Sequence, residues 1–157
     1  MKEENLKNNI NDNIKLTTEE AINLIDILKE KVNETKLKFP QLGNKIEFEV
    51  QAQRDGTRFI INITRGKIDN KKCSYQGRTY INSIALLRLC VTNSFHINPN
   101  GKKISGTHLH IYSEEHEMGN AIPFDIENAD LYDYCLSFFK KFNILEETCG
   151  ILYQTEL

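Results

Sequence analysis

Alternation of apolar and polar side chains on both sides of an Asp55-Gly56 pair is the feature that most constrains the fold. Before the pair, apolar residues recur at every second position over 46–50, and after it they do so over 59–63. A period of two gives a β-strand one apolar and one polar face, and Asp-Gly is a favoured turn between two strands. The sequence therefore predicts a β-hairpin over about residues 44–63.

Three later stretches also have the character of strands. Residues 73–80 alternate weakly, and residues 84–91 form a mostly apolar run that is typical of a strand buried on both faces. Residues 107–112 alternate strictly. A strand here places its two histidines and its tyrosine on one face and its leucine and isoleucine on the other.

Helical spacing is found near both ends of the chain. Thr17 and Glu20 have the spacing of a capping box. Apolar residues then follow at every third or fourth position, which predicts a helix over 17–36. Towards the C-terminal end, Asn128 or Asp130 is a suitable N-cap for a second helix. The buried stripe expected for that helix consists of Leu131, Cys135, Phe138, Phe139 and Phe142.

The order helix, strands, helix predicts an α+β fold, with a single twisted antiparallel sheet of about five strands and an N-terminal and a C-terminal helix packed on one face. The asparagine-rich stretch 1–16 lacks apolar periodicity and is expected to be a flexible N-terminal arm. Residues 17–157 then form a single domain, in which 151–153 could add an edge strand. The sheet face without helices is free to carry polar side chains.

The cysteine and hydropathy patterns favour a cytoplasmic protein. The four cysteines, at positions 73, 90, 135 and 149, include no CxxC pair and follow no secretory leader. We therefore expect reduced thiols rather than a disulfide framework. No apolar run approaches the roughly 18 residues that a membrane span needs. We expect no association with a membrane.

Charge is segregated along the chain, although the net charge is only −2. Residues 54–103 contain ten basic and two acidic residues, whereas residues 104–157 contain ten acidic and two basic ones. Such blocks are usually no more than a solvated surface. A basic segment beside histidines would nevertheless suit RNA or a protein complex that handles nucleic acid. The predicted nucleic-acid-binding residues are Lys102, Lys103, Arg78 and Arg58.

The candidate site lies around the histidine-bearing strand. Arg88 interrupts a mostly apolar run, and a charged residue in such a place either leaves the sheet at its end or meets an anion. If that strand and the histidine-bearing strand are antiparallel neighbours, Arg88 and Cys90 lie beside His108 and His110. The candidate catalytic residues are His96, His108, His110, Arg88 and Tyr112, with His96 carried on the connecting loop.

This region resembles an uncharacterised family of small bacterial and prophage proteins with the signature LRLD…HxNPDG…GxHxHxY. The matching residues are Leu87-Arg88-Leu89, His96-x-Asn98-Pro99-x-Gly101 and Gly106-x-His108-x-His110-x-Tyr112. The resemblance extends over about residues 44–127, and it implies no particular activity. Cys90 and Asn100 replace the two aspartates of the signature. If those carboxylates serve chemistry, this chain binds without catalysing.

Our first functional hypothesis is a toxin-type endoribonuclease that works without a metal or another cofactor. Cleavage through the 2′-hydroxyl needs an acid and a base that titrate near neutrality, and a cation for the charge that develops on the phosphate. Histidines would transfer the protons and Arg88 would bind the phosphate. Tyr112 would donate a hydrogen bond or stack on a base.

Several alternatives stay open, including whether the protein is an enzyme at all. A metal site could use His96, His108, His110 and Cys90, because histidines at alternate positions of a strand point to the same side. We rank it second because no carboxylate faces the pair. A phage-encoded inhibitor of a host defence complex, such as an anti-CRISPR protein, would need no catalysis. Each histidine taken singly is more often structural than functional. The sequence leaves the oligomeric state open.

Overall fold

The computed structural model describes residues 15–33, 36–69, 71–145 and 151. Its elements follow one another in this order: α2 (Thr18–Asp26), β1 (Lys29–Lys31), β2 (Lys45–Ala52), β3 (Arg58–Arg65), β4 (Cys73–Thr79), β5 (Ala85–Val91), β6 (Phe95–Ile97), β7 (Lys103–Ser105), β8 (His108–Ile111), β9 (Ala121–Pro123) and α3 (Leu131–Lys141).

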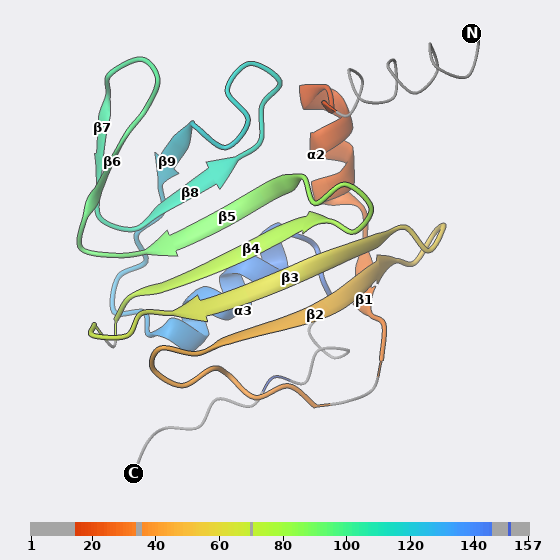
Figure 1. Ribbon diagram of the computed structural model, residues 1–157, viewed down its shortest axis with the longest axis horizontal. Coiled ribbons are helices and arrows are strands. Elements are labelled where there is room, and N and C mark those ends of the chain that lie inside the picture. The colour runs from red at the N-terminus through yellow and green to blue at the C-terminus, as the bar shows by residue number, and fades with distance from the viewer. Residues whose placement is uncertain (1–14, 34–35, 70, 146–150, 152–157) are drawn as a thin grey trace, which may run out of the picture.

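The main sheet has seven strands, and each runs antiparallel to its neighbours (Figure 1). Their order across the sheet is β1-β2-β3-β4-β5-β8-β9. The chain thus adds strands side by side from β1 to β5, leaves the sheet, and returns as β8 next to β5. In the segment between β5 and β8, the strands β6 and β7 pair with each other in a separate two-stranded sheet.

The hairpin predicted from the alternation is confirmed as β2 and β3. Phe48 lies opposite Ile61, and both side chains are buried. In the turn, Gly56 adopts a φ of +74°, which favours glycine, and the Asp55 carboxylate accepts a hydrogen bond from the Thr57 amide at 3.0 Å. The strands expected over 73–80 and 84–91 are confirmed as β4 and β5.

The hydrophobic core lies between the sheet and α3, which runs behind the sheet in Figure 1. Of the two predicted N-caps of α3, Asp130 is the one used: its carboxylate accepts from the Asp133 amide at 2.8 Å. The expected stripe of α3 is buried. Phe138 stacks on Phe142 with ring centroids 6.0 Å apart. The Phe142 ring lies so close to Gly77 that a Cβ there would be 2.7 Å from it.

The expected fold class is wrong. The protein is mostly β, with a seven-stranded and a two-stranded sheet, and not a five-stranded sheet with both helices packed on one face. The helices α2 and α3 have only nine and eleven residues, and α2 stands at one end of the sheet near β5. The unpredicted strands β1, β6, β7 and β9 have three residues each, too few for a period of two to stand out.

The helix predicted over 17–36 is also wrong in its extent. Thr17 and Glu20 form the predicted capping box, but the helix ends at Asp26. The chain then becomes the edge strand β1, which makes its hydrogen bonds with β2 rather than within a helix. Leu28, an apolar residue within the predicted helix, is exposed.

Lys29 lies fully buried just after the end of α2. Its Nζ donates to the backbone carbonyls of Ile25 and Ile27, both at 2.8 Å, and of Phe142 at 2.7 Å. The ammonium also lies 4.1 Å from the centroid of the Phe142 ring and 4.9 Å from that of Phe59. Lys29 therefore connects the C-terminal ends of α2 and α3.

Two expectations lie mostly outside the described residues. These are the N-terminal arm, of which only residues 15 and 16 are described, and the edge strand at 151–153, of which only Ile151 is described. Ile151 is buried in the core. Neither helix that the structure describes is long and apolar enough to cross a membrane.

Candidate functional site

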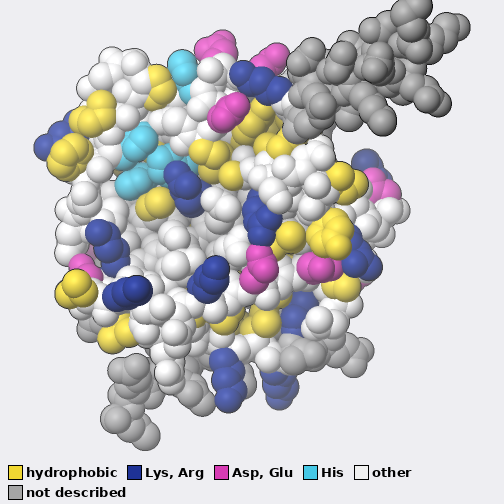
Figure 2. Space-filling view, in the orientation of Figure 1, with side chains coloured by type: hydrophobic (Ala, Val, Ile, Leu, Met, Phe, Trp, Pro, Cys, Tyr) yellow, Lys and Arg dark blue, Asp and Glu magenta, His cyan; other side chains and the backbone are white. Residues whose placement is uncertain are grey.

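The expected pairing of the arginine-bearing and histidine-bearing strands is confirmed. In the antiparallel pair β5 and β8, Cys90 lies opposite His108 and Arg88 lies opposite His110. Leu89 is fully buried in the core on the side of α3. Side chains alternate along a strand, so Arg88 and Cys90 point to the opposite face of the sheet. Figure 2 shows histidine side chains gathered on this face beside a basic side chain.

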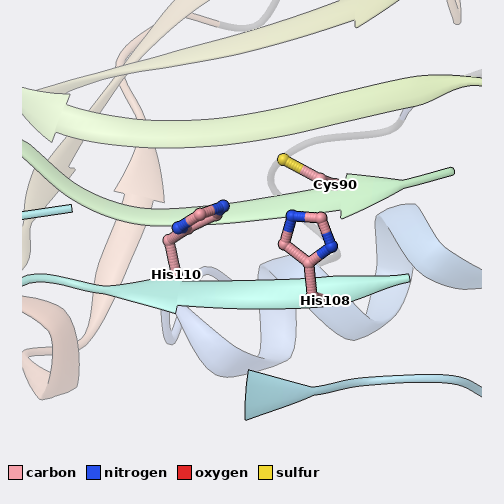
Figure 3. A group of neighbouring side chains, drawn as sticks. All are labelled: Cys90, His108 and His110. Atoms are coloured by element: carbon pink, nitrogen blue, oxygen red, sulfur yellow. The ribbon is translucent and has the colours of Figure 1, made fainter. Parts of the chain in front are cut away.

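The two strand histidines each use one ring nitrogen for a hydrogen bond to the backbone. Nδ1 of His108 lies 2.8 Å from the Gly106 carbonyl oxygen, and Nδ1 of His110 lies 2.8 Å from that of Met118. A carbonyl only accepts, so each Nδ1 carries the proton and the lone pair of the neutral ring is on Nε2. In Figure 3 both rings rise from β8 towards Cys90 on β5, and one nitrogen of each points into the space between the three side chains.

His96 closes the cluster from the β6–β7 hairpin. Its ring centroid lies 4.7 Å from that of His110 and 5.5 Å from that of His108. Its Nε2 lies 2.7 Å from the Gly119 carbonyl oxygen, so Nε2 donates and the lone pair is on Nδ1. Backbone carbonyls therefore fix the tautomers of all three histidines.

Asn98 supports the site, although the sequence indicated it only as a member of the signature motif. It begins a turn in which the Gly101 amide donates to its carbonyl at 2.8 Å. The buried Asn98 side chain donates to the Ala121 carbonyl and accepts from the Ala121 amide, both at 2.9 Å. These bonds attach the hairpin to β9 and so hold His96 over the sheet. The position of Asn98 two residues after His96 in the motif was the available signal.

Burial and a neighbouring cation shift the proton affinities of the cluster. Burial lowers the pKa of His110 to about 4, and the positive charge of Arg88 acts in the same direction. Burial raises the pKa of the Cys90 thiol, while Arg88 acts against that shift. At neutral pH, His110 is therefore an uncharged imidazole and Cys90 a thiol.

Arg88 brings a positive charge that no carboxylate in the described part of the chain balances. Among the described residues it forms no ion pair, and its buried Nε has no hydrogen-bond partner. The predicted nucleic-acid-binding arginines differ in this respect. Arg58 pairs with Glu49 at 3.1 Å, and Arg78 pairs with Glu47. Arg88 contacts the Cys90 side chain, and its positive charge is not balanced by any carboxylate of the described residues, so an anion from outside the chain can balance it.

The two lysines of the predicted nucleic-acid-binding set belong to the β6–β7 hairpin. Lys102 lies in its turn, where the backbone amide donates to the Asn100 side chain at 2.9 Å. Lys103 extends its Nζ to 4.4 Å from the Phe95 ring centroid. Together with the two arginines, the set comes from three different elements. Its contact with nucleic acid stays a prediction.

Tyr112 does not join the histidines. β8 ends at Ile111, so the alternation that would place Tyr112 beside His110 stops one residue earlier. Tyr112 is buried in the core, and its hydroxyl donates to the Leu16 carbonyl at 2.7 Å. It therefore stabilises the entry into α2 and does not reach a ligand at the cluster.

Cys90, His108 and His110 offer three ligand atoms that lie within 4.8 Å of one another. Bonds of about 2.0–2.3 Å to a tetrahedral zinc ion would bring such atoms to roughly 3.5 Å apart. Small side-chain movements would suffice to reach that geometry. His96 packs beside this group without belonging to it, so a fourth position is open to a small ligand.

A cleft of about 390 Å³ opens beside the cluster, with Cys90 and His108 in its wall. Phe95, Arg65 and Lys72 also line it. This volume lies in the range of pockets for small molecules, which typically combine apolar walls with a few polar groups. The wall of this cleft thus combines two basic side chains with two of the metal-ligand candidates.

Comparison with known proteins yields a family but no activity. A model of a family of unknown function (DUF6978) matches residues 16–144, which include both helices and both sheets. No curated protein and no solved structure matches the chain. The match agrees with the expected origin in an uncharacterised family, while the signature motif stays a prediction. The chain belongs to this family of unknown function.

Proposed function

We propose that this protein binds one transition-metal ion, preferably Zn²⁺, through Cys90, His108 and His110. The observation that carries the proposal is the use of each Nδ1–H for a backbone carbonyl, which leaves the Nε2 lone pairs for the cluster. Metal-binding histidines typically donate their second nitrogen in this way, because the hydrogen bond fixes the tautomer and the orientation of the ring. Two imidazoles and a thiol are thus already oriented for a cation.

The donor set favours zinc over magnesium or calcium. Sulfur and imidazole nitrogen suit zinc, whereas the two harder ions prefer oxygen ligands. His110, with a pKa of about 4, is already unprotonated at neutral pH and need release no proton. The Cys90 thiol loses its proton when it binds the metal.

Three protein ligands leave one position of the tetrahedron for water or substrate, as in catalytic zinc sites. A zinc ion in such a site polarises a substrate oxygen or lowers the pKa of bound water towards 7. A purely structural role is less favoured, because the cluster lies on the face of the sheet opposite α3 and outside the main hydrophobic core. His96 would help to orient the two ligand histidines by packing against their rings.

The experiment is to measure metal content and Co²⁺ uptake, with the absorption of a thiolate–cobalt bond as the readout. We expect one ion per chain in the wild type and large losses in C90S, H108Q and H110Q. H116Q is the matched control, because His116 is exposed and outside the cluster. Equal metal content in the wild type and the three cluster variants would contradict the proposal.

A second candidate is the metal-independent endoribonuclease, favoured by the position of Arg88, which pairs with no carboxylate of the described residues, beside three histidines. Its weakness is that His110, with a pKa of about 4, is a poor general acid at neutral pH. RNA cleavage in EDTA that H108Q and R88M abolish would support this candidate. Cleavage only after zinc is added would favour the metal site instead.

A further inference from the structure

We propose that the metal site and Arg88 together bind the phosphate of a small organic phosphate, with its organic part in the cleft beside Phe95. The inference rests on the proposed metal site and names the ligand class of that site. Three independent features support it: the charge balance, the position of the arginine and the cleft.

The charge balance favours a dianion. A bound Zn²⁺, a Cys90 thiolate and the Arg88 guanidinium together leave two positive charges in excess, because a histidine that ligates a metal through a nitrogen lone pair is neutral. Among the described residues no carboxylate pairs with Arg88. A phosphate monoester carries a charge of about −1.5 to −2 at pH 7. A carboxylate would balance only half of the excess.

The position of Arg88 suits an oxyanion held at two points. Arg88 lies opposite His110 on the neighbouring strand and two residues from Cys90 on the same strand face. Its planar guanidinium can donate two parallel hydrogen bonds to phosphate oxygens and cannot lose its proton. A further phosphate oxygen would occupy the fourth position of the metal.

The cleft supplies room for the organic part. Cys90 and His108 belong both to the metal site and to the wall of the cleft, so a ligand on the metal has direct access to it. Phe95 offers an aromatic face there, while Arg65 and Lys72 add positive charge. An aromatic phosphate therefore matches the cleft better than inorganic phosphate alone.

The test uses full-length protein loaded with Co²⁺ and titrated with inorganic phosphate, phenyl phosphate and benzoate, with the visible spectrum of cobalt as the readout. We expect both phosphates to change the spectrum and phenyl phosphate to bind at least tenfold more tightly than inorganic phosphate. At a Co²⁺ concentration that fully loads both proteins, the affinity of R88M for both phosphates should be at least tenfold lower than that of the wild type. R58M is the control for the same loss of charge, because Arg58 is on β3 and pairs with Glu49.

The outcomes separate the two proposals. Wild-type protein that does not load cobalt would overturn the metal site itself. Normal loading with equal phosphate affinities in the wild type and R88M would overturn the phosphate site alone. Benzoate that binds as tightly as phenyl phosphate would overturn the assignment to phosphate. The Lys variant R88K, expected to retain part of the affinity, checks that the loss in R88M follows from charge.

Discussion

Cys90 lies directly opposite His108 in the antiparallel pair of β5 and β8. The pairing of the two strands is made by backbone hydrogen bonds, so the side chain at position 90 can change without a change of register. The donor atom of the proposed metal site can therefore be exchanged while both imidazoles keep their backbone partners. That makes position 90 suitable for testing what the site binds.

We expect C90D to shift the metal preference from soft to hard ions. A carboxylate oxygen binds Mn²⁺ better relative to Cd²⁺ than a thiolate does. The ratio of Cd²⁺ to Mn²⁺ affinity should fall by at least about tenfold, measured by competition with a coloured chelator. An unchanged ratio would show that Cys90 does not touch the metal. The same variant places an aspartate at the position where the signature has one.

The N98A variant should lose stability and weaken the site. Both hydrogen bonds to Ala121 disappear, and their buried partners stay unsatisfied, which costs about 2 kcal/mol in the free energy of unfolding. Metal affinity should fall as well if His96 packs against the ligands through this hairpin. Urea unfolding and metal titration measure the two effects.

N100A is the matched control for N98A, because Asn100 is exposed in the same turn and its side chain bonds only to the nearby Lys102 amide among the bonds described. We expect a loss below about 1 kcal/mol in this variant. Equal losses in both variants would mean that the anchoring of the hairpin to β9 contributes little.

How much the sequence predicts depends on the length of each element. The eight-residue strands β2 and β3 and the helix α3 have enough positions to show a period, and they were predicted correctly. Strands of three residues, such as β1 and β9, show no period. These short strands form because they make backbone hydrogen bonds with longer neighbouring strands. The periodicity of the sequence does not show which segments pair in this way.

The candidate site was predictable where it depends on regular strands. Arg88 and Cys90 were expected beside His108 and His110, and β5 and β8 place them there. Tyr112 was misplaced because the strand ends one residue before it. The carbonyl partners of the histidines could not be predicted, because they come from loop conformations that the residue types do not specify.

We expect G77A to destabilise the fold by about 1–3 kcal/mol, the usual cost of overpacking a core. An added Cβ would lie 2.7 Å from the Phe142 ring, which is fully buried. Combining G77A with F142L should recover part of the loss relative to the sum of the single variants. Strict additivity in urea unfolding would show that the contact does not limit packing.

The buried ammonium of Lys29 should make stability depend on pH. Burial lowers the pKa of Lys29 from 10.5 to about 7, and the carboxylate of Asp26 opposes this only in part. Between these two values the unfolded chain binds more protons than the folded one. The contribution of Lys29 to the free energy of unfolding therefore rises with pH from about 7 to 10.5, by at most about 1.4 kcal/mol per pH unit.

The variant K29M removes this titration and also leaves the carbonyls of Ile25, Ile27 and Phe142 without their donor. We expect it to be less stable than the wild type, with a difference in the free energy of unfolding that grows between pH 7 and pH 10. Urea unfolding at each pH measures the difference, and K45M, at an exposed lysine, is the control. A difference that stays constant over this range would show that Lys29 keeps its proton in the fold, because its three carbonyl acceptors then stabilise the charge more than burial destabilises it.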